Sequence, residues 1–421
     1  MYSLTVSRPA CNARTEGARL RDGSGRAAQS GRKTPADAGF LGTNAKYRCK
    51  PEKVDPETGE ITGRDPMETK VQRFILQSVA RTLFDNKTSR LNKCLRLRAA
   101  HQDVQVWKST EHKTTHYKGL QTCGSVWICP VCSAKIAERR RLEIIQAMEA
   151  HQAVGGCVNM LTLTCPHQVK DNLVDLLAKQ AKALHAFWGD RVVKEILAEM
   201  GTIGQIRALE PTHGRLSPQN NGWHPHYHVL MFQGIGVDLV RFDQAQMTDW
   251  QVRLYLRWAA RCVAAGLGEP SYAHGLKLHN GDQAAKYVSK WGLEDEMTKG
   301  HTKKALFGET PFDLLRALQA DPNDKQAAAL FIEYAKAFKG KRQLHWSKGL
   351  KKRYQVTEKT DEALAAETDD KARLLGMLTI EQWRDVLAVE GRGAVLSVAA
   401  SGGWDALAAY LESIKGKGVK S

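Results

Sequence analysis

The sequence predicts an α+β protein with a central, mostly antiparallel sheet. Four segments have the Val, Leu and Thr content or the alternation of strands, and amphipathic helical patterns lie between them. The second and third of these segments, GQIRALEPTHG and HPHYHVLMF, follow one another closely enough to form a hairpin. The expected strands are 156–166, 204–214, 224–232 and 274–280, and the expected helices between and after them are 170–188, 190–200, 249–266 and 281–297.

Length and hydropathy indicate a globular protein. The chain has 421 residues, of which 42% are hydrophobic, so it can bury a large core. Its longest apolar runs, such as VLMF and AAALFI, are far shorter than the roughly 20 residues that a membrane helix needs. The first residues also lack the continuous apolar segment of a secretory signal. We therefore expect a cytoplasmic protein with no membrane partner.

The charge balance points to a polyanionic partner. Lys and Arg number 62 against 45 Asp and Glu, a net charge of +17. Nucleic acid is the expected partner, because each phosphate that a cation neutralises releases a counterion. The alternative is a basic surface that is merely solvated. One candidate for phosphate contacts is the run Arg139, Arg140 and Arg141 in the helix expected over 134–151.

Composition and pattern divide the chain into four parts. Residues 1–66 are rich in Gly, Arg, Ser, Thr and Pro without a periodic pattern, which is typical of a disordered basic arm. Residues 67–150 begin with a helical pattern and contain the clustered cysteines. Residues 151–300 hold the predicted sheet. Residues 301–421 are expected to be mostly helical, through 311–320, 324–338 and 380–390.

A CPVC segment predicts a structural zinc site in the second part. The spacing of its two cysteines lets both sulfurs face one ion, and two earlier cysteines can complete a tetrahedral set. The four expected ligands are Cys94, Cys123, Cys129 and Cys132. The fourth position, given to Cys94, could instead be taken by His101, His112, His116 or a more distant residue.

The segment GWHPHYHVLMF at 222–232 places three histidines at alternate positions before an apolar run. Successive side chains of a strand point to opposite faces, so His224, His226 and His228 share one face. Imidazoles arranged in this way can hold one metal ion. The alternative is a set of hydrogen-bonded or surface histidines. Pro225 has no backbone donor, which puts the histidines at the open end of the strand.

A second chemical candidate lies in DQAAKYVSKWG. Tyr287 and Lys290 are three residues apart, so on a helix they share a face. Taken alone, a tyrosine in a helix is most often a core or interface residue.

Several motifs together resemble a known family. In order and spacing they resemble the rolling-circle replication initiator proteins of plasmids and phages, which belong to the His-hydrophobe-His (HUH) endonuclease superfamily. The resemblance covers roughly residues 90–352 and includes the cysteine motif. The motifs are CGSVWICPVC at 123–132, LTLTCP at 161–166, RALEPT at 207–212, HPHYHVLM at 224–231, AAKYVSKW at 284–291 and KRQLHWSKGLKK at 341–352.

The resemblance implies roles for particular residues. His226 and His228 are expected to bind a divalent metal, Mg²⁺ or Mn²⁺, with Tyr227 as the hydrophobe between them. Glu210, on the partner strand, is the candidate third ligand, and His224 is ranked as accessory. Tyr287 matches the nucleophile and Lys290 the nearby cation.

The resemblance also implies an activity and partners. Residues 151–300 would be the nicking and joining domain, acting on single-stranded and duplex origin DNA. Cleavage would leave a 5′-phosphotyrosine and a free 3′-hydroxyl for a host polymerase, with a host helicase as a further partner. One departure concerns termination: some members carry a Glu one helical turn before the tyrosine, where this chain has Gln283. Asp282, which is adjacent, points elsewhere on a helix.

We compared three other functions with the sequence. A transposase or a mobilisation relaxase would use the same histidines and tyrosine on a different DNA. A zinc-dependent DNA-binding protein would have the charge and the cysteines without the catalysis. A metal-dependent amidohydrolase would need eight βα units and further His and Asp ligands, which the sequence does not supply.

Overall fold

The computed structural model divides the chain into two compact units, Met1–Gly42 and Thr43–Ser421. All described residues belong to the second unit: 53–54, 61–62, 66–84, 89–100, 102–112, 114–234, 244–281, 284–285, 288, 308–367 and 371–419. Nearly all of the expected arm, 1–66, therefore lies outside the described residues.

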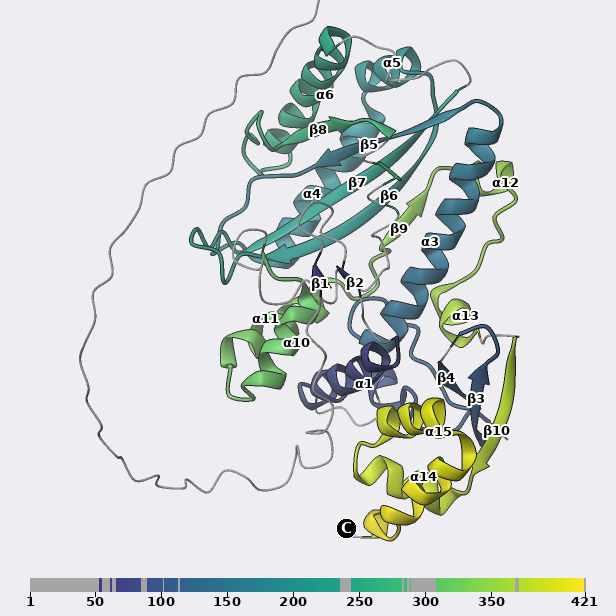
Figure 1. Ribbon diagram of the computed structural model, residues 1–421. Helices are drawn as coiled ribbons and strands as arrows, with labels where there is room; N and C mark the ends of the chain where they lie inside the picture. Colours follow the sequence, from purple (N-terminus) through teal and green to yellow (C-terminus); the bar gives the residue numbers. More distant parts are fainter. Residues whose placement is uncertain are drawn as a thin grey trace, which may run out of the picture. The chain divides into compact units, whose positions relative to one another are not determined.

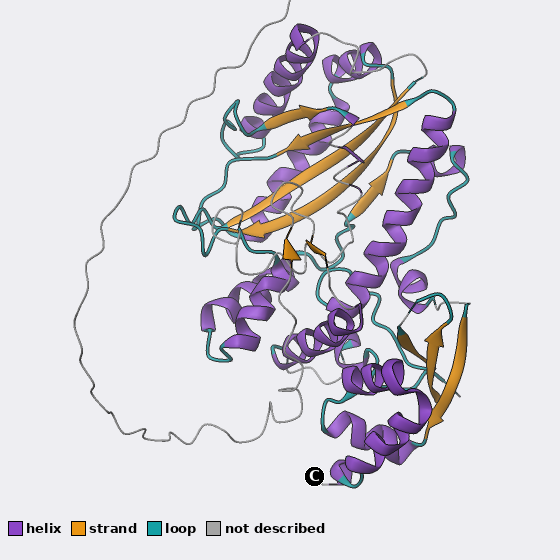
Figure 2. Ribbon diagram, viewed as in Figure 1, coloured by secondary structure: helices purple, strands orange, loops and turns teal. Residues whose placement is uncertain are grey.

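The largest sheet in the described part of the chain has five strands (Figures 1 and 2). Its strands run in the order β8-β5-β7-β6-β9, and every neighbouring pair is antiparallel. The α+β class with an antiparallel sheet is thereby confirmed. The strands are β5 (Cys157–Leu163), β6 (Thr202–His213), β7 (Trp223–Gln233), β8 (Leu276–His279) and β9 (Leu344–Trp346).

One face of this sheet is covered by three helices. Val229 and Met231, which alternate along β7, are buried in this core together with Leu161 and Leu163 of β5. The apolar stripes of the helices supply the other side of the core. These helices are α4 (Leu173–Gly189), α5 (Arg191–Glu199) and α6 (Gln244–Ala264).

The opposite face packs against α3 (Pro130–Ala153) and α12 (Leu350–Arg353). Leu230 and Phe232 of β7 point to this side, as the period of two along a strand requires. The histidines of β7 have the same parity as Leu230 and Phe232. They therefore lie on the α3 face of the sheet, beyond the end of its apolar core.

A second sheet has three strands in the order β10-β3-β4, all antiparallel. It packs on α1 (Pro66–Thr82), α14 (Ile380–Ala388) and α15 (Arg392–Ser413). Its strands, which the sequence patterns did not reveal, are β3 (Val104–Ser109), β4 (Thr115–Lys118) and β10 (Ala372–Leu378).

A further core joins the cysteine region to the helical region after residue 308. It contains Phe331 and Tyr334 of α11 (Lys325–Ala337), and Leu314 of α10 (Pro311–Ala320). The shorter elements are β1 (Lys53–Val54), β2 (Ile61–Thr62), α2 (Arg90–Lys93), α13 (Asp361–Ala366) and the 3-10 helix Lys417–Val419.

In the described part of the chain, only α15 has the length and apolar composition of a membrane span. Core helices of soluble proteins meet the same criteria. Val395, Leu396 and Leu407 of α15 are buried in the core beneath the three-stranded sheet, and the helix is interrupted at Gly403. This helix is therefore weak evidence for a membrane segment.

Candidate metal centres on the sheet and at the cysteines

The hairpin of β6 and β7 brings a carboxylate beside two histidines. Glu210 and His226 are direct cross-strand partners, and His228 lies two residues further along β7. Paired residues of antiparallel strands point to the same face, so all three side chains converge there. Glu210 Oε2 is 3.7 Å from His226 Nε2 and 3.6 Å from His228 Nε2. The three ligand atoms lie within 4.8 Å of one another, a spacing that one ion can bridge.

Hydrogen bonds orient both imidazole rings. His226 Nδ1 donates to the backbone oxygen of His224 (3.2 Å), and His228 Nδ1 lies 3.1 Å from Thr162 Oγ1. A carbonyl oxygen can only accept, so His226 carries its proton on Nδ1 and keeps the Nε2 lone pair for a ligand. Such partners fix the tautomer and orientation of histidines that bind metals.

Burial keeps the two rings neutral. It lowers the pKa of His226, and it lowers the pKa of His228 to about 3, with neighbouring histidines adding to the effect. Neutral imidazole is the form that coordinates a metal. The donor set of two nitrogens and one carboxylate fits a divalent cation, since carboxylates suit Mg²⁺ and Mn²⁺ and imidazoles suit transition metals.

His224 has the same parity but a different position. Its ring stacks between those of His226 and His167, with centroids 4.9 and 4.7 Å apart, and it is not one of the three converging ligands. Burial lowers the pKa of His224 to about 3. Its backbone oxygen orients His226, which fits an accessory position.

The site lies where β7 extends past β5. The β5 pairing ends at Leu163 and Tyr227, so Pro225 pairs only with Pro211 of β6. Gln180 Nε2 donates a hydrogen bond to the Pro225 oxygen (2.8 Å). No β5 residue lies opposite Pro225, so its missing backbone donor breaks no hydrogen bond to β5. His224 and His226 lie beyond the end of β5, at the open end of the strand as expected, whereas His228 still pairs with Thr162.

The expected nucleophile Tyr287 and the cation Lys290 lie outside the described residues, as does Gln283. Two residues close to Tyr287 in the sequence belong to the described part of the chain. Ala284 and Val288 are helical and buried, at 0% and 2% exposure, in the core on the α3 face of the sheet. That is the face on which Glu210, His226 and His228 converge.

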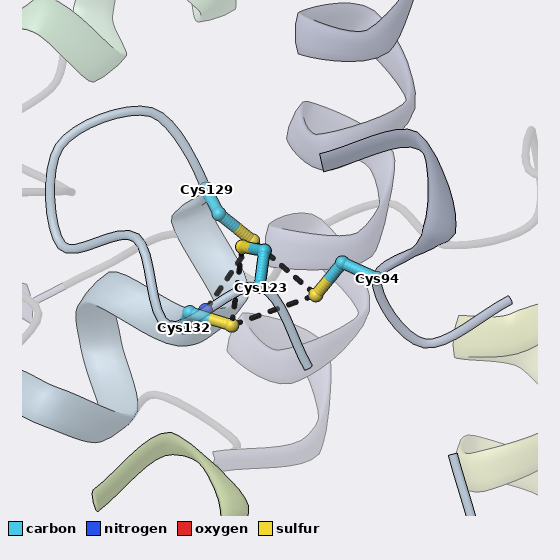
Figure 3. A group of neighbouring side chains, drawn as sticks. All are labelled: Cys94, Cys123, Cys129 and Cys132. Atoms are coloured by element: carbon cyan, nitrogen blue, oxygen red, sulfur yellow. Dashed lines mark hydrogen bonds between the residues drawn. The ribbon is translucent and has the colours of Figure 1, made fainter. Parts of the chain in front are cut away.

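The four cysteines expected to bind zinc form one buried cluster (Figure 3). Cys132 Sγ lies 3.5 Å from Cys94 Sγ and 3.6 Å from Cys123 Sγ, and Cys94 Sγ lies 3.9 Å from Cys129 Sγ. Sulfurs bound tetrahedrally at ~2.3 Å from zinc are about 3.8 Å apart, so these distances suit the ion. His112 and His116 are not in the group, and His101 lies outside the described residues.

Local structure holds this cluster together. Cys129 caps the N-terminus of α3, where its sulfur accepts a hydrogen bond from the backbone nitrogen of Cys132 (3.5 Å). Cys94 directly follows α2. The sulfurs of all four residues are thus brought together by two helix ends and the loop between β4 and α3.

The sheet also brings polar residues to the site that we did not predict. Thr162 of β5 contacts His228, and Lys277 and His279 of β8 point to the same face. The alternation in LKLH, with Leu276 and Leu278 buried, was the available signal for the last two. The arginines at 139–141, which were the candidate for phosphate contacts, each form an ion pair in the structure: Arg139 with Glu367, Arg140 with Glu143 and Asp361, and Arg141 with Glu138.

The fold and site define an α+β protein that carries a two-histidine, one-glutamate group on an antiparallel sheet and a separate four-cysteine cluster. A family described as "Replication protein" matches residues 116–245, from β4 to the first turn of α6. The match includes Cys123, Cys129 and Cys132 and all three residues of the sheet site.

Two curated relatives extend the comparison. "Protein rep" of Streptomyces lividans is 26% identical over 295 residues, which cover 55% of this chain and 63% of the relative. "Neomycin resistance protein" of Streptomyces cyanogenus is 34% identical over 169 residues, 32% of this chain and 38% of the relative. The chain thus spans less than two thirds of either relative. No solved structure matches. These matches confirm the resemblance to replication initiator proteins that the motifs indicated.

Proposed function

We propose that the protein initiates rolling-circle replication by nicking single-stranded origin DNA. In this proposal Tyr287 attacks the scissile phosphate, becomes linked to the 5′ end and leaves a free 3′-hydroxyl as primer; the strand is later rejoined. The support comes from the similarity to replication proteins, the net charge of +17 and the group of Glu210, His226 and His228.

One observation carries the proposal. The core that contains Ala284 and Val288 is on the same face of the sheet as the three converging ligands. Tyr287 precedes Val288 directly in the sequence. Ala284 and Val288 are buried on that face, and in this proposal Tyr287 reaches a phosphate that is held by the metal group.

The chemistry can be divided among the residues. Glu210, His226 and His228 hold the divalent cation, Mg²⁺ or Mn²⁺, which when bound withdraws charge from a non-bridging phosphate oxygen. Tyr287 loses its proton and its oxygen forms a bond to phosphorus, while the bond to the 3′ oxygen breaks and that oxygen takes up a proton. Lys290 stabilises the charge that develops. One phosphate ester replaces another, so a 3′-hydroxyl can reverse the step.

The cysteine cluster has a structural role in this proposal. Cys94, Cys123, Cys129 and Cys132 are buried and bind zinc as thiolates, which contributes on the order of 10 kcal/mol to folding. This zinc is distinct from the catalytic ion, since no residue is shared between the two groups.

The remaining expectations follow from the same assignment. Residues 151–300 form the nicking and joining domain, and single-stranded and duplex origin DNA are its substrates. A host helicase opens the duplex and a host polymerase extends the 3′-hydroxyl. The protein acts in the cytoplasm. Gln283 is a neutral amide, so it is not the base that activates water at termination.

The test is a denaturing gel with labelled single-stranded oligonucleotide and Mn²⁺. The wild type should form a covalent adduct, and Tyr287→Phe, which removes only the nucleophilic oxygen, should form none. Tyr272→Phe, at an exposed tyrosine, is the matched control and should behave as the wild type. An adduct that persists in Tyr287→Phe contradicts the assignment, and a wild type that binds DNA without nicking it favours the non-catalytic alternative.

A further inference from the structure

A lysine on β8 shares a cross-strand row with a metal-site histidine. Thr162 of β5 pairs with His228 on one side and with Lys277 on the other. Directly paired residues of antiparallel strands point to the same face. Lys277 therefore belongs to the face that carries Glu210, His226 and His228.

Two further observations support this orientation. Leu276 and Leu278, on either side of Lys277, are buried at 0% and 8% exposure in the core of the opposite face. His279, two residues further along β8, has the same parity as Lys277 and pairs with Met160, which is buried in the core on that face. Lys277 is only partly exposed.

Lys277 forms no salt bridge with an acidic residue in the part of the chain that the structure describes. A partly buried ammonium loses hydration that an anion can replace. A phosphate supplies that anion, because the neighbouring metal group already places DNA on this face in the proposed function.

The distance decides which phosphate is involved. Two strand spacings separate Lys277 from His228, roughly 10 Å between backbones. Glu210 of the same group is on β6, one strand further from Lys277 than His228 is. A phosphate held at the metal group is too far from Lys277 for close contact with its ammonium group. The next phosphate along the DNA strand is within reach, because the lysine side chain is long and flexible.

We propose that Lys277 binds the DNA phosphate next to the scissile one, so that the single strand crosses the sheet from β6 toward β8. This inference rests on the proposed function and adds a path for the DNA. Lys277 is thus a positioning residue that sets the register of the substrate over the metal group.

The test measures binding of oligonucleotides in which single phosphates are replaced, one at a time, by uncharged methylphosphonate. Every protein in this test, including the parent, also carries Tyr287→Phe, so that the DNA is not cleaved during the measurement. Lys277→Ala and the length-conserving Lys277→Met remove the charge, and Lys277→Arg retains it. Lys182→Ala, at an exposed lysine of α4 on the opposite face, is the matched control.

One charge contact with single-stranded DNA contributes about 0.7 to the slope of log affinity against log salt, and roughly fourfold in affinity near 0.15 M salt. We expect this loss for Lys277→Ala and Lys277→Met, with Lys277→Arg and Lys182→Ala close to the parent protein. Methylphosphonate beside the scissile position should weaken the parent by a similar factor and leave Lys277→Ala unaffected.

Two results would overturn the inference while leaving the proposed function intact. One is an unchanged salt slope in Lys277→Ala. The other is equal sensitivity of parent and Lys277→Ala to methylphosphonate at every position. Absence of any single-stranded DNA binding by the wild type would instead contradict the proposed function itself.

Discussion

The side-chain amide of Gln77 donates a hydrogen bond to the sulfur of Cys129, 3.1 Å away. The oxygen of the same amide accepts a hydrogen bond from Arg392 at 2.6 Å, and Gln77, Cys129 and Arg392 are each fully buried. Arg392 begins α15, so one glutamine connects the cysteine cluster with the C-terminal helices. A hydrogen bond donated to a thiolate sulfur stabilises the negative charge of that sulfur. A glutamine side chain has both an NH₂ donor and an oxygen acceptor, so Gln77 can bond to Cys129 and Arg392 at the same time.

Gln77→Leu should lower zinc affinity by roughly tenfold or more, which is the usual effect of removing a hydrogen-bond partner from a metal ligand. It also leaves Arg392 without one of its acceptors. Competition with a chromophoric chelator measures the affinity. Gln180→Leu, at an equally buried glutamine that donates to the Pro225 oxygen, should retain wild-type zinc affinity. Equal affinities for Gln77→Leu and the wild type would argue against a role for this bond.

Cys129→Ser should remove about one equivalent of zinc and lower the stability of the fold, because a hydroxyl is a poor substitute for a thiolate. Atomic absorption on purified protein gives the zinc content, and urea denaturation gives the stability. Cys262→Ser is the control, since Cys262 is fully buried but lies outside the cluster. Zinc content that is unchanged in Cys129→Ser would show that the ion is bound elsewhere.

His226→Ala and His228→Ala should each abolish metal-dependent cleavage and leave duplex DNA binding largely intact, because affinity comes mainly from distributed Lys and Arg. His224→Ala should reduce cleavage less, since the backbone oxygen that orients His226 remains. Adduct formation and gel shifts measured in parallel separate the two effects. If all three variants lost cleavage equally, the choice of ligand pair would be wrong.

Glu390 should make stability dependent on pH in the acid range. Burial alone would raise its pKa, but Arg392, Arg96 and Arg81 outweigh that effect and hold the pKa at about 2. An acid with a lowered pKa in the folded state stabilises the fold above its unfolded pKa, near 4.5, and this contribution disappears as the pH falls toward 2.

Glu390→Gln should therefore be less stable than the wild type at pH 7, by up to about 3 kcal/mol. The difference should remain nearly complete at pH 5 and shrink in urea denaturation curves recorded at pH 4 and then pH 3. Glu412→Gln is the control, because Glu412 lies in an exposed pair with Lys415. A difference that stays constant from pH 7 to pH 3 would contradict the stabilising ion cluster.

The candidate site was predictable where it depends on short-range pattern. Alternation along one strand grouped His226 with His228, and the hairpin supplied Glu210. Thr162 and Lys277 were not identified, because their proximity to His228 depends on the strand order β8-β5-β7, which the sequence does not state. The position of Tyr287 stays a prediction, since that residue lies outside the described part.

The fold was predictable for the long elements and not for the short or distant ones. β5 to β8 and helices α4 to α6 match the expected segments, as their periodicity is strong. β9 has only three residues, and β3 becomes a strand by pairing with β4 and with the distant β10. The described residues after 300 are mostly helical, as expected. The prediction did not include β9 and β10, each of which completes a sheet.

The pairing of β3 with β10 affects the order in which the protein can fold during synthesis. The sheet that contains Val104–Ser109 cannot be completed until Ala372–Leu378 has been synthesised. Likewise, Gln77 cannot form its hydrogen bond until Arg392 has been synthesised. Meanwhile Val104 and Val106, which end up buried, lack their final cover. Contacts between such distant segments form slowly and leave apolar surface exposed in the meantime. The cysteine region, though early in the chain, is thus among the last parts to reach its final packing during synthesis.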